Sequence, residues 1–257
     1  MEGTIKIALV GAGMFGGDVH ARAYADLQRA GISSQLGRVG LDKWTRDFAP
    51  LKFELVAVAT RSEKSAKLAQ KNFKDWSGYE PKAFFGETPW LDVLRDFPDL
   101  DVIAVATPDN LHTQVILAAL ERGVHVITEK PMCLSIHEAD EIISLAQGKN
   151  RIVAVDMHKR YDPDHLRIRD DIQKRIGDPL YGTAYLEEPL EVSLSTFKWA
   201  EQSDPFSYVG PQWVDLIFHF TDRNPFRSRP SVRRNVLCAT ALMPMTPCRC
   251  AWNTRTA

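Results

Sequence analysis

The sequence has no long hydrophobic run. Its best apolar segments are interrupted or bounded by charged residues, among them Lys6, Asp18, Asp101 and Asp109. A membrane-spanning helix needs about 18 or more consecutive apolar residues, so no transmembrane segment and no membrane partner are expected. Hydrophobic residues still make up 44% of the 257 residues, which excludes a disordered chain and predicts a globular protein of one large or two modest domains.

Cysteine is scarce, and three of the four cysteines lie near the C-terminus, at Cys238, Cys248 and Cys250. This spacing lacks the paired C-x2-C elements of zinc sites, so no metal is expected. Near the N-terminus, the glycines after Val10 and the charge of Asp18 break the apolar stretch that a secretory signal needs. We therefore predict a cytoplasmic protein with reduced cysteines.

The C-terminal stretch 226–257 lacks acidic residues, lysine and glycine, but carries six arginines. Because the net charge of the chain is −1, residues 1–225 carry −7. A basic tail can bind nucleic acid, but apolar clusters such as 236–237 and 241–243 interrupt this one, so no nucleic-acid partner is expected. We interpret 226–257 as an atypical basic tail, of the kind that an altered reading frame or a divergent splice end produces.

The first 160 residues alternate β-rich runs with amphipathic segments. The β-rich runs are 4–10, 53–59, 102–106, 124–127 and 152–155. Helices are expected after the glycines that follow Val10, after Ser62, after Thr88 and Pro89, over 111–120, and after the capping box Ser135-x-x-Glu138. Repeated βα units of this kind predict an α/β fold with a doubly wound parallel Rossmann sheet.

The first strand is followed by the motif Gly11-Ala-Gly13-Met14-Phe15-Gly16. In this context Gly11 permits a tight turn, Gly13 lets the backbone approach a pyrophosphate, and Gly16 allows close packing of helix and strand. The anion would lie at the helix N-terminus. The alternative is a glycine turn that only connects strand and helix.

Residues at the end of the second strand distinguish NAD from NADP. An acidic residue there holds the ribose 2′-hydroxyl of NAD, whereas arginine accommodates the 2′-phosphate of NADP. The sequence offers Arg61, Ser62 and Lys64, which favours NADP over NAD. The alternative is that Arg61 and Lys64 are solvated surface residues.

Four motifs resemble, in order and spacing, the Gfo/Idh/MocA oxidoreductases: 11–16, 106–112, 129–131 and 159–163. The resemblance covers about residues 4–225. It implies a dinucleotide-binding Rossmann domain over 1–130 and a partial substrate and oligomerisation domain over 131–225, an α+β domain with an antiparallel sheet. It also implies NAD(P)-dependent hydride transfer on a sugar, polyol or related carbonyl compound.

The resemblance also assigns roles to individual residues. The residues expected to line the nicotinamide side of the cofactor are Thr107, Pro108, Asn110 and His112. Glu129 and Lys130 would face the nicotinamide and the substrate, with Lys130 handling the proton of the reacting hydroxyl; Lys159 and Asp215 are further substrate residues. Considered alone, His112 is more simply a histidine that packs locally at a helix start, and Lys130 a surface lysine.

One position departs from the family pattern. Gln212 stands where the family commonly has an acid/base histidine, and an amide cannot take a proton at neutral pH, so Lys130 or Tyr161 would have to act alone. The sheet is expected to stop near Arg227, which leaves the homo-oligomer typical of the family in doubt. Two alternatives remain: a nucleotide-binding regulatory protein of the same fold without turnover, and a methyltransferase, in which Arg61 and Glu129 have no role.

Overall fold

The structure is a computed structural model that describes residues 3–37, 41, 51–177, 179, 181–186, 203–221 and 248–253. The chain divides into two compact units, Met1–Asp156 and Met157–Ala257. Within the described ranges no helix has both the length and the apolar character that crossing a membrane requires.

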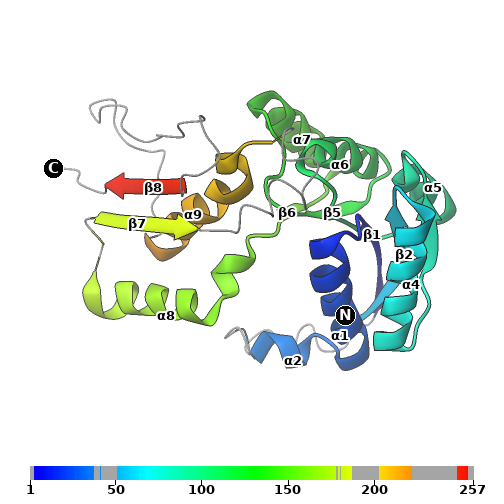
Figure 1. The fold of residues 1–257 in the computed structure, drawn as a ribbon, viewed down its shortest axis with the longest axis horizontal. Coiled ribbons are helices and arrows are strands. Elements are labelled where there is room, and N and C mark those ends of the chain that lie inside the picture. Colours follow the sequence, from blue (N-terminus) through cyan, green and yellow to red (C-terminus); the bar gives the residue numbers. More distant parts are fainter. Residues whose placement is uncertain are drawn as a thin grey trace. The chain divides into compact units, whose positions relative to one another are not determined.

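The first unit is built on a six-stranded parallel sheet of order β3-β2-β1-β4-β5-β6 (Figure 1). Its strands are β1 Gly3–Val10, β2 Leu51–Thr60, β3 Lys82–Phe85, β4 Val102–Val105, β5 His125–Thr128 and β6 Val153–Val155. The helices between them are α1 Ala21–Ala30, α2 Ser33–Leu36, α4 Glu63–Ser77, α5 Pro89–Asp96, α6 His112–Glu121 and α7 Ile136–Lys149. This strand order is that of dinucleotide-binding Rossmann folds, so the predicted fold class is confirmed.

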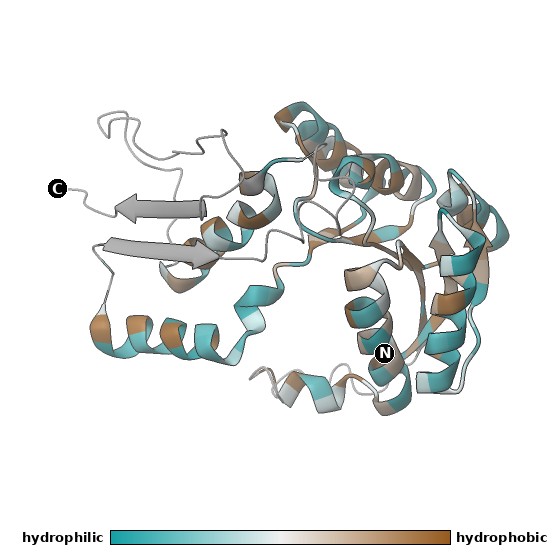
Figure 2. Cartoon of the chain, viewed as in Figure 1, coloured by the Kyte–Doolittle hydropathy of each residue, from teal (hydrophilic) through white to brown (hydrophobic). Residues whose placement is uncertain are grey.

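The sheet is covered on both faces because its strands are apolar on both sides. Along β1, Ile7 and Leu9 pack with residues of α1 and α4, whereas Ala8 and Val10 pack with residues of α5, α6 and α7. The helices need only one apolar face, and Figure 2 shows hydrophilic and hydrophobic residues alternating around the turns of α4. The core of this unit therefore has two layers, one on each side of the sheet.

Side-chain caps begin two of the helices as the sequence predicts. Ser62 accepts a hydrogen bond from the amide of Ser65 at the start of α4, and Ser135 accepts one from the amide of Glu138 at the start of α7. In return, the Glu138 carboxylate accepts from the Leu134 amide and from the Ser135 hydroxyl. Helix α5 begins at Pro89 as expected, but the hydroxyl of Thr88 makes no capping bond.

The first unit ends at Asp156 rather than near residue 130. The difference arises because β6 pairs with β5 from Val126 to Thr128. Helix α7 likewise packs Ile142 and Ala146 into the core beside the sheet. The segment that follows Lys130 therefore completes the Rossmann sheet before the second unit starts.

The described residues of the second unit form two longer helices and a two-stranded antiparallel sheet. Its elements are η5 His158–Tyr161, α8 Pro163–Asp171, η6 Ile172–Ile176, β7 Tyr181–Leu186, α9 Pro205–Thr221 and β8 Cys248–Asn253. Strand β8 lies in the basic tail and pairs with β7 over the whole length of both strands. The expectation that the sheet stops near Arg227 is therefore wrong, whereas Cys238 and most of the tail's arginines lie outside the described residues.

Replacing Phe73 by alanine tests the α4 layer of the core. The Phe73 side chain is 0% exposed, so Phe73→Ala should lower the free energy of unfolding by about 3–5 kcal/mol through lost burial and a cavity. Leu68 on the same helix is 54% exposed, and Leu68→Ala should change the free energy of unfolding by no more than about 0.5 kcal/mol. Urea denaturation of both variants measures the difference, and equal losses would contradict this packing.

Candidate cofactor and catalytic site

All six strands of the parallel sheet end at the same edge, and the predicted site residues of the first unit follow four of them, β1, β2, β4 and β5. Backbone hydrogen bonds continue past the strand ends, from the Gly11 amide to Ala59, from Ala106 to Val10, from Glu129 to Val105 and from Asp156 to Thr128, at 2.8–2.9 Å. Ligands of open α/β sheets bind at this carboxyl edge. The structure therefore gathers the glycine turn, the segment after β4 and the Glu129-Lys130 segment into one region.

The glycine turn is packed too closely for side chains at two of its positions. Gly11 has φ +92°, and a Cβ there would lie 2.7 Å from the Thr107 amide nitrogen and closer still to the Ala106 carbonyl. A Cβ on Gly16 would collide with the Gly11 carbonyl and lie 3.1 Å from the Ala106 Cβ. Both glycines thus let the turn after β1 rest directly on the end of β4, as the motif predicts.

The third glycine faces open space. A Cβ on Gly13 would have nothing within 4 Å among the residues that the structure describes, and Met14 and Phe15 beside it are exposed. Across the turn, the hydroxyl oxygen of Thr107 is buried and has no hydrogen-bond partner in the described part of the chain. Open room at a helix start and an unsatisfied donor fit a phosphate-bearing dinucleotide.

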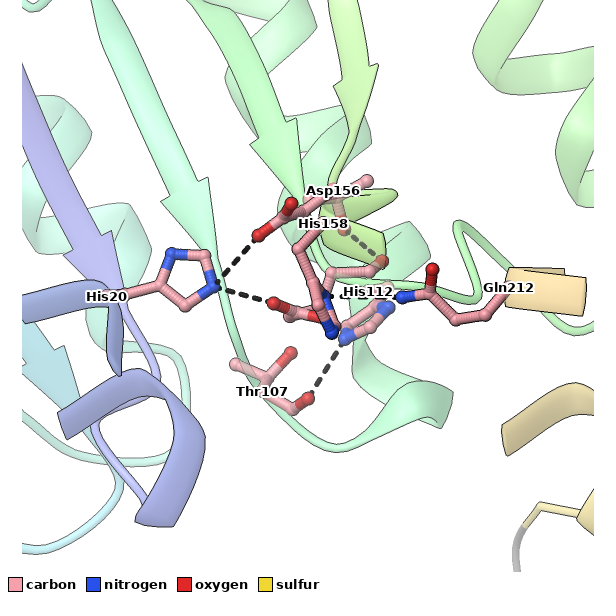
Figure 3. Close-up of polar contacts among 8 residues, drawn as sticks. His20, Thr107, His112, Asp156, His158 and Gln212 are labelled. Atoms are coloured by element: carbon pink, nitrogen blue, oxygen red, sulfur yellow. Dashed lines mark hydrogen bonds and ion pairs between the residues drawn. The ribbon is translucent and has the colours of Figure 1, made fainter. Parts of the chain in front are cut away.

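His112 lies beneath this surface and joins two of its segments. Its side chain is 0% exposed, and its ring nitrogens lie 2.7 Å from the Pro131 carbonyl oxygen and 2.9 Å from that of Thr107 (Figure 3). Because carbonyl oxygens only accept hydrogen bonds, the ring nitrogen that carries the hydrogen donates to its carbonyl, and the other nitrogen lies in contact with the second carbonyl. His112 therefore ties the segment after β4 to the segment after β5, which is the local packing role that the residue suggested when considered alone.

The end of β2 carries an exposed basic cluster. Arg61, Ser62 and Lys64 are all exposed, and the Ser62 oxygen already caps α4. No acidic residue stands between Thr60 and Ser62, and Glu63 forms an ion pair with Lys67 on the same helix. The site that the sequence assigns to the ribose thus offers positive charge and a hydroxyl.

Lys130 follows a buried carboxylate. Glu129 is 8% exposed, and its Oε1 lies 2.6 Å from Nε2 of His20, which in turn lies 3.7 Å from Oδ2 of Asp156 (Figure 3). Within the described ranges, these three residues form a group whose ligand atoms lie close enough to hold a cation. The sequence expectation named Glu129 and Lys130 but not His20 or Asp156.

In the second unit, Gln212 and Asp215 lie on α9 and contact residues of η5. The Gln212 amide nitrogen lies 3.3 Å from Nδ1 of His158 (Figure 3), and the Gln212 oxygen is buried without a partner among the described residues. Asp215 accepts two hydrogen bonds from the Arg160 guanidinium, one of 2.6 Å from Nε. This pairing raises the pKa of Arg160.

Two residues within or beside the motif 159–163 that the sequence does not single out, His158 and Arg160, contact residues of α9. Lys159 is half-buried and Tyr161 is 53% exposed, while Arg160 between them is the residue that binds Asp215. His158 lies directly before the motif, and this position is the one feature of the sequence that could have indicated it. Asp162 caps α8, because its side chain accepts from the Asp164 amide.

Comparison with known proteins agrees with this geometry. The family model GFO_IDH_MocA, described as an oxidoreductase family with an NAD-binding Rossmann fold, matches residues 5–157. The uncharacterized oxidoreductase YdgJ of Escherichia coli is 28% identical over 176 residues, which cover 66% of this chain and 44% of that protein. The D-glucoside 3-dehydrogenase of the same organism is 28% identical over 182 residues, covering 70% and 42%.

A solved structure gives the same architecture. Levoglucosan dehydrogenase, in complex with NADH and levoglucosan, is similar with a TM-score of 0.66 at 22% sequence identity, over 85% of this chain and 54% of that chain. At this identity the likeness shows the fold alone. The chain spans roughly half the length of these relatives.

Gly13 offers a test that separates ligand space from packing space. Gly13→Ala should leave the free energy of unfolding within about 0.5 kcal/mol of wild type, because the added Cβ meets nothing. Dinucleotide affinity, measured by calorimetric titration, should fall because the Cβ occupies room needed by the pyrophosphate. Gly16→Ala, the matched control, should lose stability and affinity together. Unchanged affinity in Gly13→Ala would show that the ligand does not approach there.

Proposed function

We infer the function of this chain from the fact that it belongs to the Gfo/Idh/MocA oxidoreductases, the family with an NAD-binding Rossmann fold whose model spans residues 5–157. We propose that it is an NAD(P)-dependent oxidoreductase acting on a sugar, polyol or related carbonyl compound. The observation that carries the proposal is the meeting of the glycine turn, Thr107 and Glu129-Lys130 at one sheet edge.

The residues of the glycine turn would hold the cofactor. Backbone amides at the start of the helix that follows Gly13 would bind the pyrophosphate, and the unsatisfied Thr107 hydroxyl would bind on the nicotinamide side. Pro108 and Asn110 follow Thr107 on the same side. When bound, the nicotinamide accepts or supplies the hydride.

Lys130 would handle the proton of the reacting hydroxyl. In the oxidation direction its neutral amine would take that proton, and in the reverse direction its ammonium would polarise the carbonyl and return the proton to the oxygen. Gln212 can orient a hydroxyl but cannot take its proton. We therefore propose that Lys130 handles the proton, with Tyr161 as the alternative, and that Lys159 contacts the substrate.

The substrate class rests on the relatives. Those with specific names include D-glucoside 3-dehydrogenase, levoglucosan dehydrogenase and 1,5-anhydro-D-fructose reductase, and all three names denote chemistry on a sugar or anhydrosugar. Asp215 is less suited to a direct substrate contact, because the Arg160 guanidinium already occupies both of its carboxylate oxygens. We assign it to positioning η5 on α9.

A second candidate function is nucleotide-dependent regulation without turnover. Gln212 is the observation that favours it, because the residue at the expected acid/base position carries no ionisable group. Assay of NAD⁺ and NADP⁺ reduction over a panel of sugars and polyols separates the two functions. Turnover of any panel member supports the oxidoreductase, whereas tight nucleotide binding without turnover supports regulation.

Arg61 tests the preference for NADP. We propose that the exposed guanidinium binds the 2′-phosphate, so Arg61→Ala should weaken NADP binding by about 1.5–3 kcal/mol, the range of a charge-assisted hydrogen bond, and leave NAD binding nearly unchanged. Lys71→Ala removes an exposed charge from α4 and serves as the control. Equal weakening of both cofactors, or tighter binding of NAD by the unmutated chain, would refute the preference.

Lys130 tests the reaction itself. Lys130→Met should lower kcat by about 100-fold or more, as expected for a positioned acid or base, with little change in nucleotide affinity. Steady-state kinetics on the best substrate of the panel measure the first quantity and fluorescence titration the second. Lys71→Met is the matched control and should keep the kcat of the wild type; if Lys130→Met also keeps it, Lys130 is only a surface residue.

A further inference from the structure

His20 is a buried histidine at the glycine turn that the proposed reaction does not yet use. His20 is 6% exposed, and it is the last residue of the π-helix η1, Gly16–His20. Its Nε2 lies 2.6 Å from Glu129, 109 residues further along the chain, and 3.7 Å from Asp156 (Figure 3). It is thus the link between the helix that follows the glycine turn and the ends of β5 and β6.

The π-helix explains how His20 reaches these carboxylates. The Ala21 amide bonds the Gly16 carbonyl, five residues back, rather than the residue four back as in an α-helix. Such a turn accommodates one extra residue and so changes the direction in which the next side chains point. Because Gly16 is packed against Gly11, the start of η1 is fixed, and the direction of the His20 ring follows from it.

The buried Glu129 carboxylate needs a hydrogen-bond donor, because a buried carboxylate is costly unless it is paired. A carboxylate oxygen only accepts hydrogen bonds, so the 2.6 Å contact makes Nε2 of His20 the donor. The ring of Tyr24 lies 6.0 Å from that of His20. Burial raises the pKa of Tyr24, and the charges of Asp156 and Glu129 raise it further, so its hydroxyl stays neutral.

We infer that His20 is a positioning residue, whose Nε2–H holds the Glu129 carboxylate next to the helix that follows the glycine turn and so fixes the backbone that carries Lys130. The inference rests on the proposed function for its catalytic consequence, but not for the interaction itself. Without this donor the Glu129 carboxylate loses its bond to the helix, and Lys130 should be less well placed.

A divalent cation is the competing occupant of this cluster, since the three ligand atoms lie within 4.8 Å of one another. The shortest separation argues against it. Two ligand atoms bonded to one zinc ion at about 2.0–2.1 Å in tetrahedral geometry lie more than about 3 Å apart, whereas His20 Nε2 and Glu129 Oε1 lie 2.6 Å apart. That distance is typical of a hydrogen bond between charged groups.

The kinetic test uses one variant that removes the donor and one that keeps it. His20→Ala removes the Nε2 donor and should lower kcat about tenfold or more, in the range of one charge-assisted hydrogen bond, while KM changes less than kcat. In His20→Gln the amide can donate in place of Nε2 and should recover part of the lost kcat. His137→Ala, at an exposed position of α7, should behave as wild type. Wild-type kcat in His20→Ala would overturn the inference.

A second measurement does not depend on turnover. Nitrogen-15 spectra of the full chain, labelled on histidine, report the protonation of each imidazole. Nε2 of His20 should carry a hydrogen in the wild type, and its signal should shift in Glu129→Gln. A His20 ring whose Nε2 carries no hydrogen would overturn the inference even if the enzyme is active. Zn²⁺ titration completes the test, because stoichiometric binding that is lost in His20→Gln would show a metal site instead.

Discussion

The arrangement of the site depends on the missing side chain at Gly11. A Cβ at this position would overlap the end of β4, so only glycine lets the turn after β1 rest on Ala106 and Thr107. The close contact brings the start of η1 beside the segment after β4, and from there His20 reaches the segment after β5. One steric constraint thus determines where the nucleotide-binding turn lies relative to Glu129 and Lys130.

Local patterns account for most of what could be predicted from the sequence. Strand runs that are apolar on both sides, a glycine turn and the capping box at Ser135 each report on their own few residues, and the parallel sheet follows from their alternation. The domain boundary that the sequence predicts near residue 130 lies too early, because β6 has only three residues. A strand of that length becomes recognisable as part of the sheet only through its pairing with β5.

The site was harder to predict because its contacts join residues far apart in the chain. His20 and Glu129 are 109 residues apart, and Arg160 and Asp215 are 55 apart. No short motif records such pairs. Resemblance to a family identified Glu129 and Asp215 by position but did not indicate their partners, so the charge balance of both pairs became visible only in three dimensions.

The two carbonyl contacts of His112 have a consequence for ligand capture. Because one rigid ring contacts the carbonyls of both Thr107 and Pro131, the segments after β4 and β5 cannot move apart without breaking at least one buried polar contact. A ligand that arrives at this edge meets a preorganised rim, and little conformational entropy is lost in ordering it on binding. His112 would thus favour ligand binding by holding the two segments in place, without contacting the ligand itself.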